Sequence, residues 1–125
     1  MATIEITKES FESTVESGIV LVDWWAAWCG PCRAFAPTFE AASEAHRDVV
    51  FGKVDTDAQP ELSAGFGIRS IPTLMVFRDG ILLFAQPGVL PAAALEELIG
   101  KVRTLDMDDV RRQIAEAEAA ERDAG

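Results

Sequence analysis

An almost uninterrupted apolar segment near the start of the chain places the strongest constraint on its fold. Residues 19–25 read IVLVDWW, with Asp23 as the only charged side chain. Strands covered on both faces have continuous apolar sequences of this kind, typical of the interior of a sheet with parallel strands. We therefore expect a central strand over residues 19–25, with helices on both faces of its sheet.

Shorter apolar runs alternate with helical patterns along the remaining chain. We expect further strands over residues 3–6, 49–55, 73–77 and 81–85. The expected helices cover residues 8–17 with Thr7 as the cap, 32–46 with a kink at Pro37, 57–64 with Asp57 as the cap, and a segment that begins near Pro91. Alternating strands and helices imply parallel strands, and Asp79-Gly80 between the last two runs predicts an antiparallel hairpin. The predicted fold class is α/β, with a central mixed β-sheet flanked by helices.

Residues 104–125 differ in composition from the rest of the chain. Seven acidic residues and three arginines occur there, and Met107, Val110 and Ile114 recur at helical spacing. This pattern predicts a partly solvated helix that docks along one thin apolar stripe. We divide the chain into a domain over residues 1–103 and an acidic, helical C-terminal extension over residues 104–125.

The bulk composition limits the possible functions. The chain has 125 residues, 49% of them apolar, which suits one domain with one core. A net charge of −10 argues against nucleic acids and anionic membranes as partners, because binding to either requires basic patches. No stretch approaches the roughly 18 apolar residues that cross a bilayer, and no signal peptide is visible. We therefore expect a cytoplasmic location.

The two cysteines of the chain, Cys29 and Cys32, are three positions apart. A disulfide that closes so short a loop constrains the unfolded chain very little, so a structural crosslink explains the pair poorly. Half of a zinc site is an alternative, but structural zinc has four ligands and His46 is the only other strong candidate. We therefore expect no metal site and interpret the pair as a reactive dithiol.

The predicted position of the two cysteines explains why they should react. Cys29 follows the central strand and precedes a helix, whose free N–H groups favour a thiolate. We expect Cys29 to be the exposed, attacking sulfur and Cys32, about one turn deeper, to be the resolving sulfur. Gly30 gives the backbone freedom for the two sulfurs to meet, and Pro31 fixes one φ angle.

Three segments resemble the thioredoxin family: residues 22–32 (VDWWAAWCGPC), 53–55 (KVD) and 68–73 (IRSIPT). The resemblance covers about residues 3–103. It implies the thioredoxin fold and an enzyme, a thiol–disulfide oxidoreductase that reduces oxidised proteins in general in the cytoplasm. It also implies that thioredoxin reductase resets the Cys29–Cys32 disulfide with electrons from NADPH. We expect a monomer with no bound cofactor.

The resemblance also implies roles for single residues. Asp23 matches the family's buried acid, which accepts a proton from Cys32, and Lys53 matches the lysine near that acid. Pro72 matches the cis-proline that faces the cysteines, where the backbone of Ile71 can pair with an extended partner segment. The residues that match the apolar, substrate-binding rim are Trp28, Gly30, Pro31, Ile71 and Gly88. From the residues alone, Asp23 could equally be a strand-end acid that reaches solvent, and Trp28 could belong to the core. We expect Trp24 and Trp25 to be core residues, although Trp25 also matches a family tryptophan that packs near the site.

Three functions stay open at this point. The chain could be a general reductant of protein disulfides, a reductant dedicated to a few partners, or a binding module whose contacts matter more than its redox state. Gly-Pro between the cysteines adds no cation there, and a less stabilised dithiol is the stronger reductant, which favours reduction over oxidation. Arg33 stands where many family members have lysine, and either cation favours a nearby thiolate.

Overall fold

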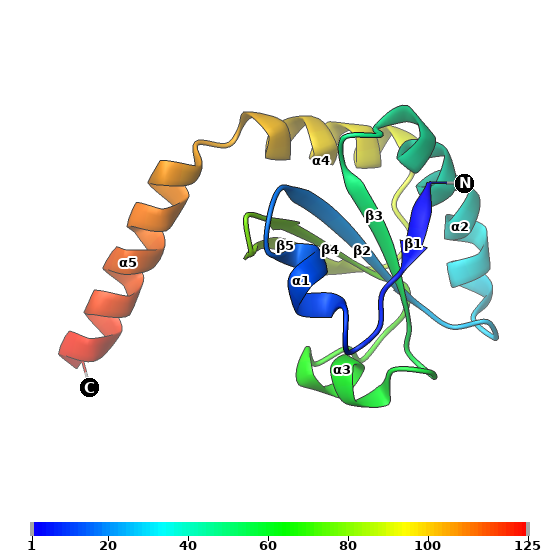
Figure 1. Ribbon diagram of the computed structural model, residues 1–125, viewed down its shortest axis with the longest axis horizontal. Helices are drawn as coiled ribbons and strands as arrows, with labels where there is room; N and C mark the ends of the chain where they lie inside the picture. Colours follow the sequence, from blue (N-terminus) through cyan, green and yellow to red (C-terminus); the bar gives the residue numbers. More distant parts are fainter. Residues whose placement is uncertain (1, 125) are drawn as a thin grey trace.

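The computed structural model describes residues 2–124, which contain one five-stranded sheet (Figure 1). The strands are β1 (Thr3–Glu5), β2 (Ile19–Trp25), β3 (Val50–Asp55), β4 (Thr73–Arg78) and β5 (Ile81–Pro87). Their order across the sheet is β1-β3-β2-β4-β5. Strands β1, β3 and β2 are parallel, whereas β4 is antiparallel to both β2 and β5. The predicted mixed sheet, with residues 19–25 as its central strand, is confirmed.

Helices cover both faces of the sheet, as the alternating pattern predicts (Figure 1). They are α1 (Phe11–Val15), α2 (Gly30–Ala45), α3 (Pro60–Gly65), α4 (Ala92–Thr104) and α5 (Met107–Ala124). Successive side chains of a strand point to opposite faces, and β2 uses this alternation to contact both helical layers. Leu21 packs in a cluster with Phe39 of α2 and Leu95 of α4, whereas Trp24 packs against Phe11 of α1. The central strand is therefore buried from both sides.

Two residues that we expected to cap helices lie in turns before those helices begin. Thr7 does not cap α1, because its amide donates to Ser10 Oγ (3.0 Å) in a turn and the helix begins only at Phe11. Asp57 does not cap α3, which begins at Pro60. The Asp57 amide instead donates to Asp55 Oδ1 (2.9 Å). Both predicted helices therefore start too early.

The remaining boundaries shift by a few residues. Strand β4 continues through Arg78, β5 continues through Pro87, and Pro91 is the N-cap of α4 rather than part of its first turn. Helix α2 begins at Gly30, two residues before the predicted start, for a reason that lies in the functional site.

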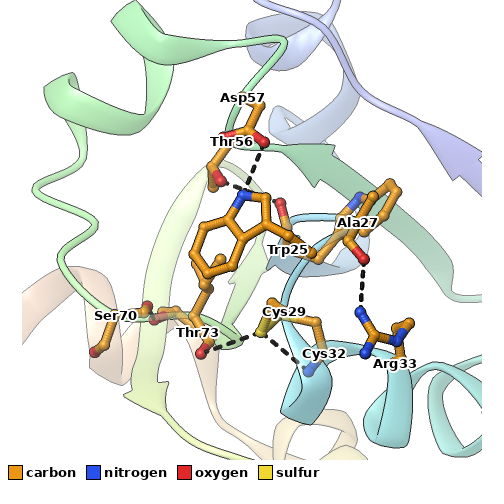
Figure 2. Close-up of a disulfide and its surroundings, with 11 residues drawn as sticks. Trp25, Ala27, Cys29, Cys32, Arg33, Thr56, Asp57, Ser70 and Thr73 are labelled. Carbon is orange, nitrogen blue, oxygen red and sulfur yellow. Dashed lines mark hydrogen bonds between the residues drawn. A yellow bond between two sulfur atoms is a disulfide. The ribbon is translucent and has the colours of Figure 1, made fainter.

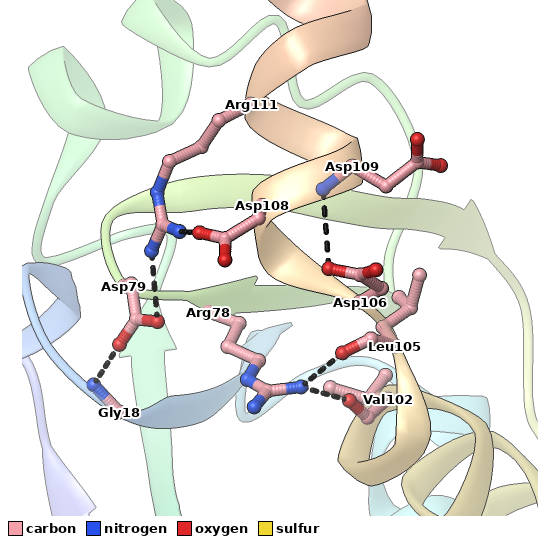
Figure 3. A network of polar contacts seen from close by, with 9 residues as sticks. All are labelled: Gly18, Arg78, Asp79, Val102, Leu105, Asp106, Asp108, Asp109 and Arg111. Carbon is pink, nitrogen blue, oxygen red and sulfur yellow. Dashed lines mark hydrogen bonds and ion pairs between the residues drawn. The ribbon is translucent and has the colours of Figure 1, made fainter.

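Helix α5 projects away from the body of the protein (Figure 1). Met107 at its start is buried, but Ile114 is 38% exposed, so the expected docking along a stripe is wrong beyond the first turn. Figure 3 shows what holds the helix start: Arg111 binds Asp79 in the β4–β5 turn (3.4 Å), and Arg78 donates to the carbonyl of Leu105 (3.1 Å). No helix within residues 2–124 is long and apolar enough to cross a membrane.

Candidate redox site

The two cysteines form a disulfide at the carboxyl end of β2, where α2 begins (Figure 2). Cys29 is the N-cap residue of α2, and its Sγ accepts a hydrogen bond from the amide of Cys32 (3.2 Å). Helix α2 starts early because a sulfur, rather than a hydroxyl or carboxylate, provides the cap. The amide of Cys32, which has no partner within the helix, and the positive end of a 16-residue helix therefore both point at Cys29 Sγ. Both favour a thiolate there when the disulfide is reduced.

The disulfide is more enclosed than the sequence suggested. Cys29 is 4% exposed and Cys32 is 2% exposed, so the expectation of an exposed Cys29 is wrong for this oxidised form. Buried Ala26 and the partly buried side chains of Trp25 and Ile71 pack against the pair. Trp24 is fully buried in the core, as expected, whereas Trp25 lies beside the cysteines.

The loop before β4 brings Pro72 to the cysteines. The Ile71–Pro72 peptide bond is cis, and the carbonyl oxygen of Ile71 lies 3.7 Å from Cys29 Sγ. The amide of Gly88 donates to the carbonyl of Pro72 (2.8 Å), so the end of β5 closes this side of the site. Gly88 has φ of 105°, a conformation that L side chains rarely adopt. Ile71, which is distant from the cysteines in sequence, thus meets the disulfide in space, with Pro72 next to it and Gly88 bound to Pro72.

An exposed apolar rim surrounds the enclosed disulfide. Gly30, Pro31 and Gly88 are exposed, and Trp28 is 67% exposed. Trp28 is therefore not a core residue. Its indole Nε1 donates to Asp57 Oδ2 (2.9 Å), which fixes a large aromatic surface at the residue before Cys29.

Asp23 lies in β2 and is completely buried. Within residues 2–124, neither of its carboxylate oxygens has a hydrogen-bond partner. Burial raises the pKa of Asp23 from its ordinary value of 3.8 to about 7, and the positive charge of Lys53 partly opposes this rise. Asp23 therefore does not reach solvent, and its carboxyl group can take up or release a proton near neutral pH.

Lys53 lies opposite Asp23 in the register of β2 and β3. Its Nζ lies 4.9 Å from the centre of the Trp25 ring, a cation–π distance. It also lines a surface pocket of about 380 Å³ together with Glu5 and Asp55. The lysine thus places a solvent-accessible positive charge next to the strand position of the buried acid.

Two contacts at the site join residues that no pattern in the sequence connects. Asp57 holds Trp28, and Arg33 Nη1 donates to the carbonyl of Ala27 (2.8 Å). Each contact joins a helix or loop to the segment between β2 and Cys29. Neither pairing follows from sequence periodicity. Arg33 could be connected with the site only because it follows Cys32 directly in the sequence.

His46 has ordinary partners at the end of α2. Its Nε2 lies 2.6 Å from Glu96 Oε2, and its Nδ1 lies 3.0 Å from Arg103 Nη2. In the part of the chain that the structure describes, no three His, Cys, Asp or Glu residues are grouped as metal ligands would be. The redox-active group is the disulfide itself.

Comparisons with known proteins agree with this geometry. The sequence model of the thioredoxin family matches residues 2–101. "Putative thioredoxin 2" of Streptomyces coelicolor is 58% identical over 119 residues, covering 94% of this chain and 89% of that protein. "Thioredoxin" of Bacillus subtilis is 39% identical and "Thioredoxin" of Staphylococcus aureus is 42% identical, each covering 81% of this chain and 98% of the relative.

Proposed function

This chain belongs to the thioredoxin family of thiol–disulfide oxidoreductases, and on that premise we propose that it is a general protein-disulfide reductase in which Cys29 attacks and Cys32 resolves. The observation that carries this assignment is the asymmetry of the pair. Cys29 Sγ accepts the Cys32 amide at the start of α2 and lies beside the Ile71 carbonyl, whereas Cys32 lies within the helix. The helix N-terminus therefore favours charge on Cys29.

The reaction begins when the Cys29 thiolate attacks one sulfur of a partner disulfide. A mixed disulfide forms, and the other partner sulfur leaves as a thiolate that takes a proton from water. Cys32 then transfers its proton to Asp23, directly or through water, and attacks Cys29 Sγ. The second partner thiolate leaves, so the partner gains two electrons and the Cys29–Cys32 disulfide forms again.

The rim provides the surface for partners. An extended partner segment pairs with the backbone of Ile71 beside Pro72, and Trp28, Gly30, Pro31 and Gly88 cover its flanks. The exposure of the rim supports this role, because a flat apolar surface accepts many sequences. Lys53 lowers the cost of an ionised Asp23 while Cys32 gives up its proton.

Thioredoxin reductase, which takes electrons from NADPH, is the partner that resets the disulfide. The chain works as a monomer in the cytoplasm, where cellular reductants keep cysteine pairs of this kind in the dithiol form. Residues 104–125 form an extension beyond a catalytic domain of residues 1–103. The family match over residues 2–101 and the projection of α5 away from the body support this division.

Reduction of insulin, coupled to NADPH and a thioredoxin reductase, tests the proposal. The unmodified chain should turn over, and Cys29→Ser should have no activity because no attacking sulfur remains. A matched substitution of an exposed residue far from the site, Ser13→Ala, should leave the rate unchanged. Activity retained by Cys29→Ser would rule out the assignment.

A further inference from the structure

The positive charges of this acidic chain are unevenly neutralised. Six cations form ion pairs with carboxylates: Lys8, Arg47, Lys101, Arg103, Arg111 and Arg112. Arg78 instead donates to two backbone carbonyls, and Lys53 covers Trp25. Among the described residues, three arginines have no carboxylate partner: Arg33, Arg69 and Arg122. Arg122 lies near the end of α5, whereas Arg33 and Arg69 lie on segments that border the disulfide.

Arg33 lies in the first turns of α2 and is exposed. Its hydrogen bond to the Ala27 carbonyl (2.8 Å) fixes the guanidinium beside the segment that carries Cys29 (Figure 2). A Cβ atom on Gly30 would lie 3.9 Å from Arg33 Nη2, so the guanidinium also approaches the residue between the two cysteines. A guanidinium has five N–H donors, and most of those on Arg33 are left for a partner.

Arg69 is exposed and lies in the loop that leads to Pro72, two residues before Ile71. A groove of about 210 Å³ runs between this loop and the ends of β4 and β5. Arg69 is the only charged residue among the described residues that line it. Thr73 and Pro87 also line the groove, next to Pro72 and Gly88. A partner segment that continues beyond the Ile71 edge therefore meets an unpaired arginine.

We propose that Arg33 and Arg69 select partner disulfides in acidic segments, with an aspartate or glutamate within a few residues of the attacked cysteine. This inference rests on the proposed reductase function. The acid at the rim, Asp57, is bound to the Trp28 indole and lies in a different direction from Cys29 than Arg33 does (Figure 2). A carboxylate near either arginine therefore finds a donor that no other group occupies.

The net charge of −10 does not cancel this preference at physiological salt. Charges are screened over about 8 Å at 0.15 M ionic strength, so distant acids such as those of α5 contribute little at the rim. The charged groups at the rim therefore matter most: Arg33 and Arg69 offer N–H donors to a partner, whereas Asp57 is already bound to Trp28. An exposed ion pair of this kind should change kcat/KM by about two- to fivefold.

Three disulfide-linked peptides of equal length, with Glu, Gln or Lys beside the cysteine, test the inference at about 0.15 M salt. We expect kcat/KM to fall in the order Glu, Gln, Lys. Arg33→Gln and Arg69→Gln should each lower the Glu-to-Gln ratio about two- to fivefold. Arg122→Gln, which makes the same change of net charge on α5, should leave the ratio unchanged. Because a change in Cys29 reactivity would alter all three rates equally, the ratio isolates recognition.

Equal rates for the three peptides, or ratios that neither rim substitution changes, would overturn the inference. These outcomes differ from failure of the reductase assignment, in which the unmodified chain would not reduce even the Gln peptide. A ratio that falls equally in Arg122→Gln would also overturn it, because net charge rather than the rim would then be responsible.

Discussion

Asp23 is the residue at which stability and chemistry conflict. Its burial without a hydrogen-bond partner, in the part of the chain that the structure describes, makes ionisation costly. A carboxyl group with a pKa of about 7 in the folded protein, against an ordinary 3.8, holds its proton more tightly when folded. The folded state is thus favoured while the group is protonated, and stability is lost as pH rises from about 4 through 7.

Asp23→Asn should therefore stabilise the oxidised protein, and increasingly so at higher pH. The gain should be small near pH 4 and approach about 4 kcal/mol above pH 8, since each pKa unit corresponds to about 1.4 kcal/mol. Urea unfolding between pH 4 and 9 measures it. Asp123→Asn, at an exposed position of α5, serves as the control and should show no such trend. A gain that does not vary with pH would contradict the buried, titrating carboxyl.

The protonation state of Asp23 should also set the rate at which Cys32 resolves the mixed disulfide. The rate at which Cys32 releases a mixed disulfide should rise with pH through an inflection near 7, where Asp23 becomes able to accept a proton. Asp23→Asn should lose that inflection and slow the step by about 10²-fold or more at pH 8. Single-turnover measurements on a preformed mixed disulfide provide the profile. An unchanged inflection in the variant would remove Asp23 from the mechanism.

Asp57 should act on the reaction through Trp28. Asp57→Ala removes the acceptor of the indole N–H and should raise KM for protein disulfides about two- to fivefold, with little change in kcat. Asp57→Asn keeps an acceptor oxygen and should restore KM. If Asp57→Ala lowers kcat and leaves KM unchanged, the aspartate does not work by holding Trp28.

At the scale of elements, strands were easier to predict than helix ends. The apolar run of β2 corresponds to its observed span because burial on both faces depends on side-chain type alone. The starts of α2 and α3 depend on which partner a polar atom finds. Cys29 Sγ caps α2, whereas Asp57 binds Trp28 instead of capping α3. Both contacts depend on which groups meet in the folded protein.

Helix α5 should contribute little to the stability of the fold. Beyond buried Met107 it is held mainly by ion pairs of exposed side chains, such as Arg111 with Asp79. Removal of residues 108–125 should cost less than about 2 kcal/mol and leave insulin reduction unchanged. Met107→Ala in the full chain should cost as much or more, because it opens a buried site. Urea unfolding of both variants compares them, and a larger loss on truncation would show that α5 supports the core.

At the scale of the whole molecule, the fold gathers the site from three regions of the chain. The end of β2, the start of α2 and the cis Ile71–Pro72 loop meet at one edge of the sheet. The cysteines and Asp23 could be singled out from residue type and position, because a close dithiol and an acid in an apolar strand are unusual. Ile71, Pro72 and Gly88 required the family resemblance, since the contact of Ile71 with Cys29 spans more than 40 residues and Gly88 is joined to the site only through Pro72.

The central claim is that Cys29 attacks and Cys32 resolves, and trapping tests it most directly. Cys32→Ser, mixed with a protein that contains one accessible disulfide, should accumulate a mixed disulfide through Cys29, because no second sulfur can release it. Mass spectrometry of the digested adduct identifies the linked cysteine. The account predicts a Cys29 adduct with Cys32→Ser and none with Cys29→Ser. A stable adduct through Cys32 in Cys29→Ser, with none in Cys32→Ser, would contradict it.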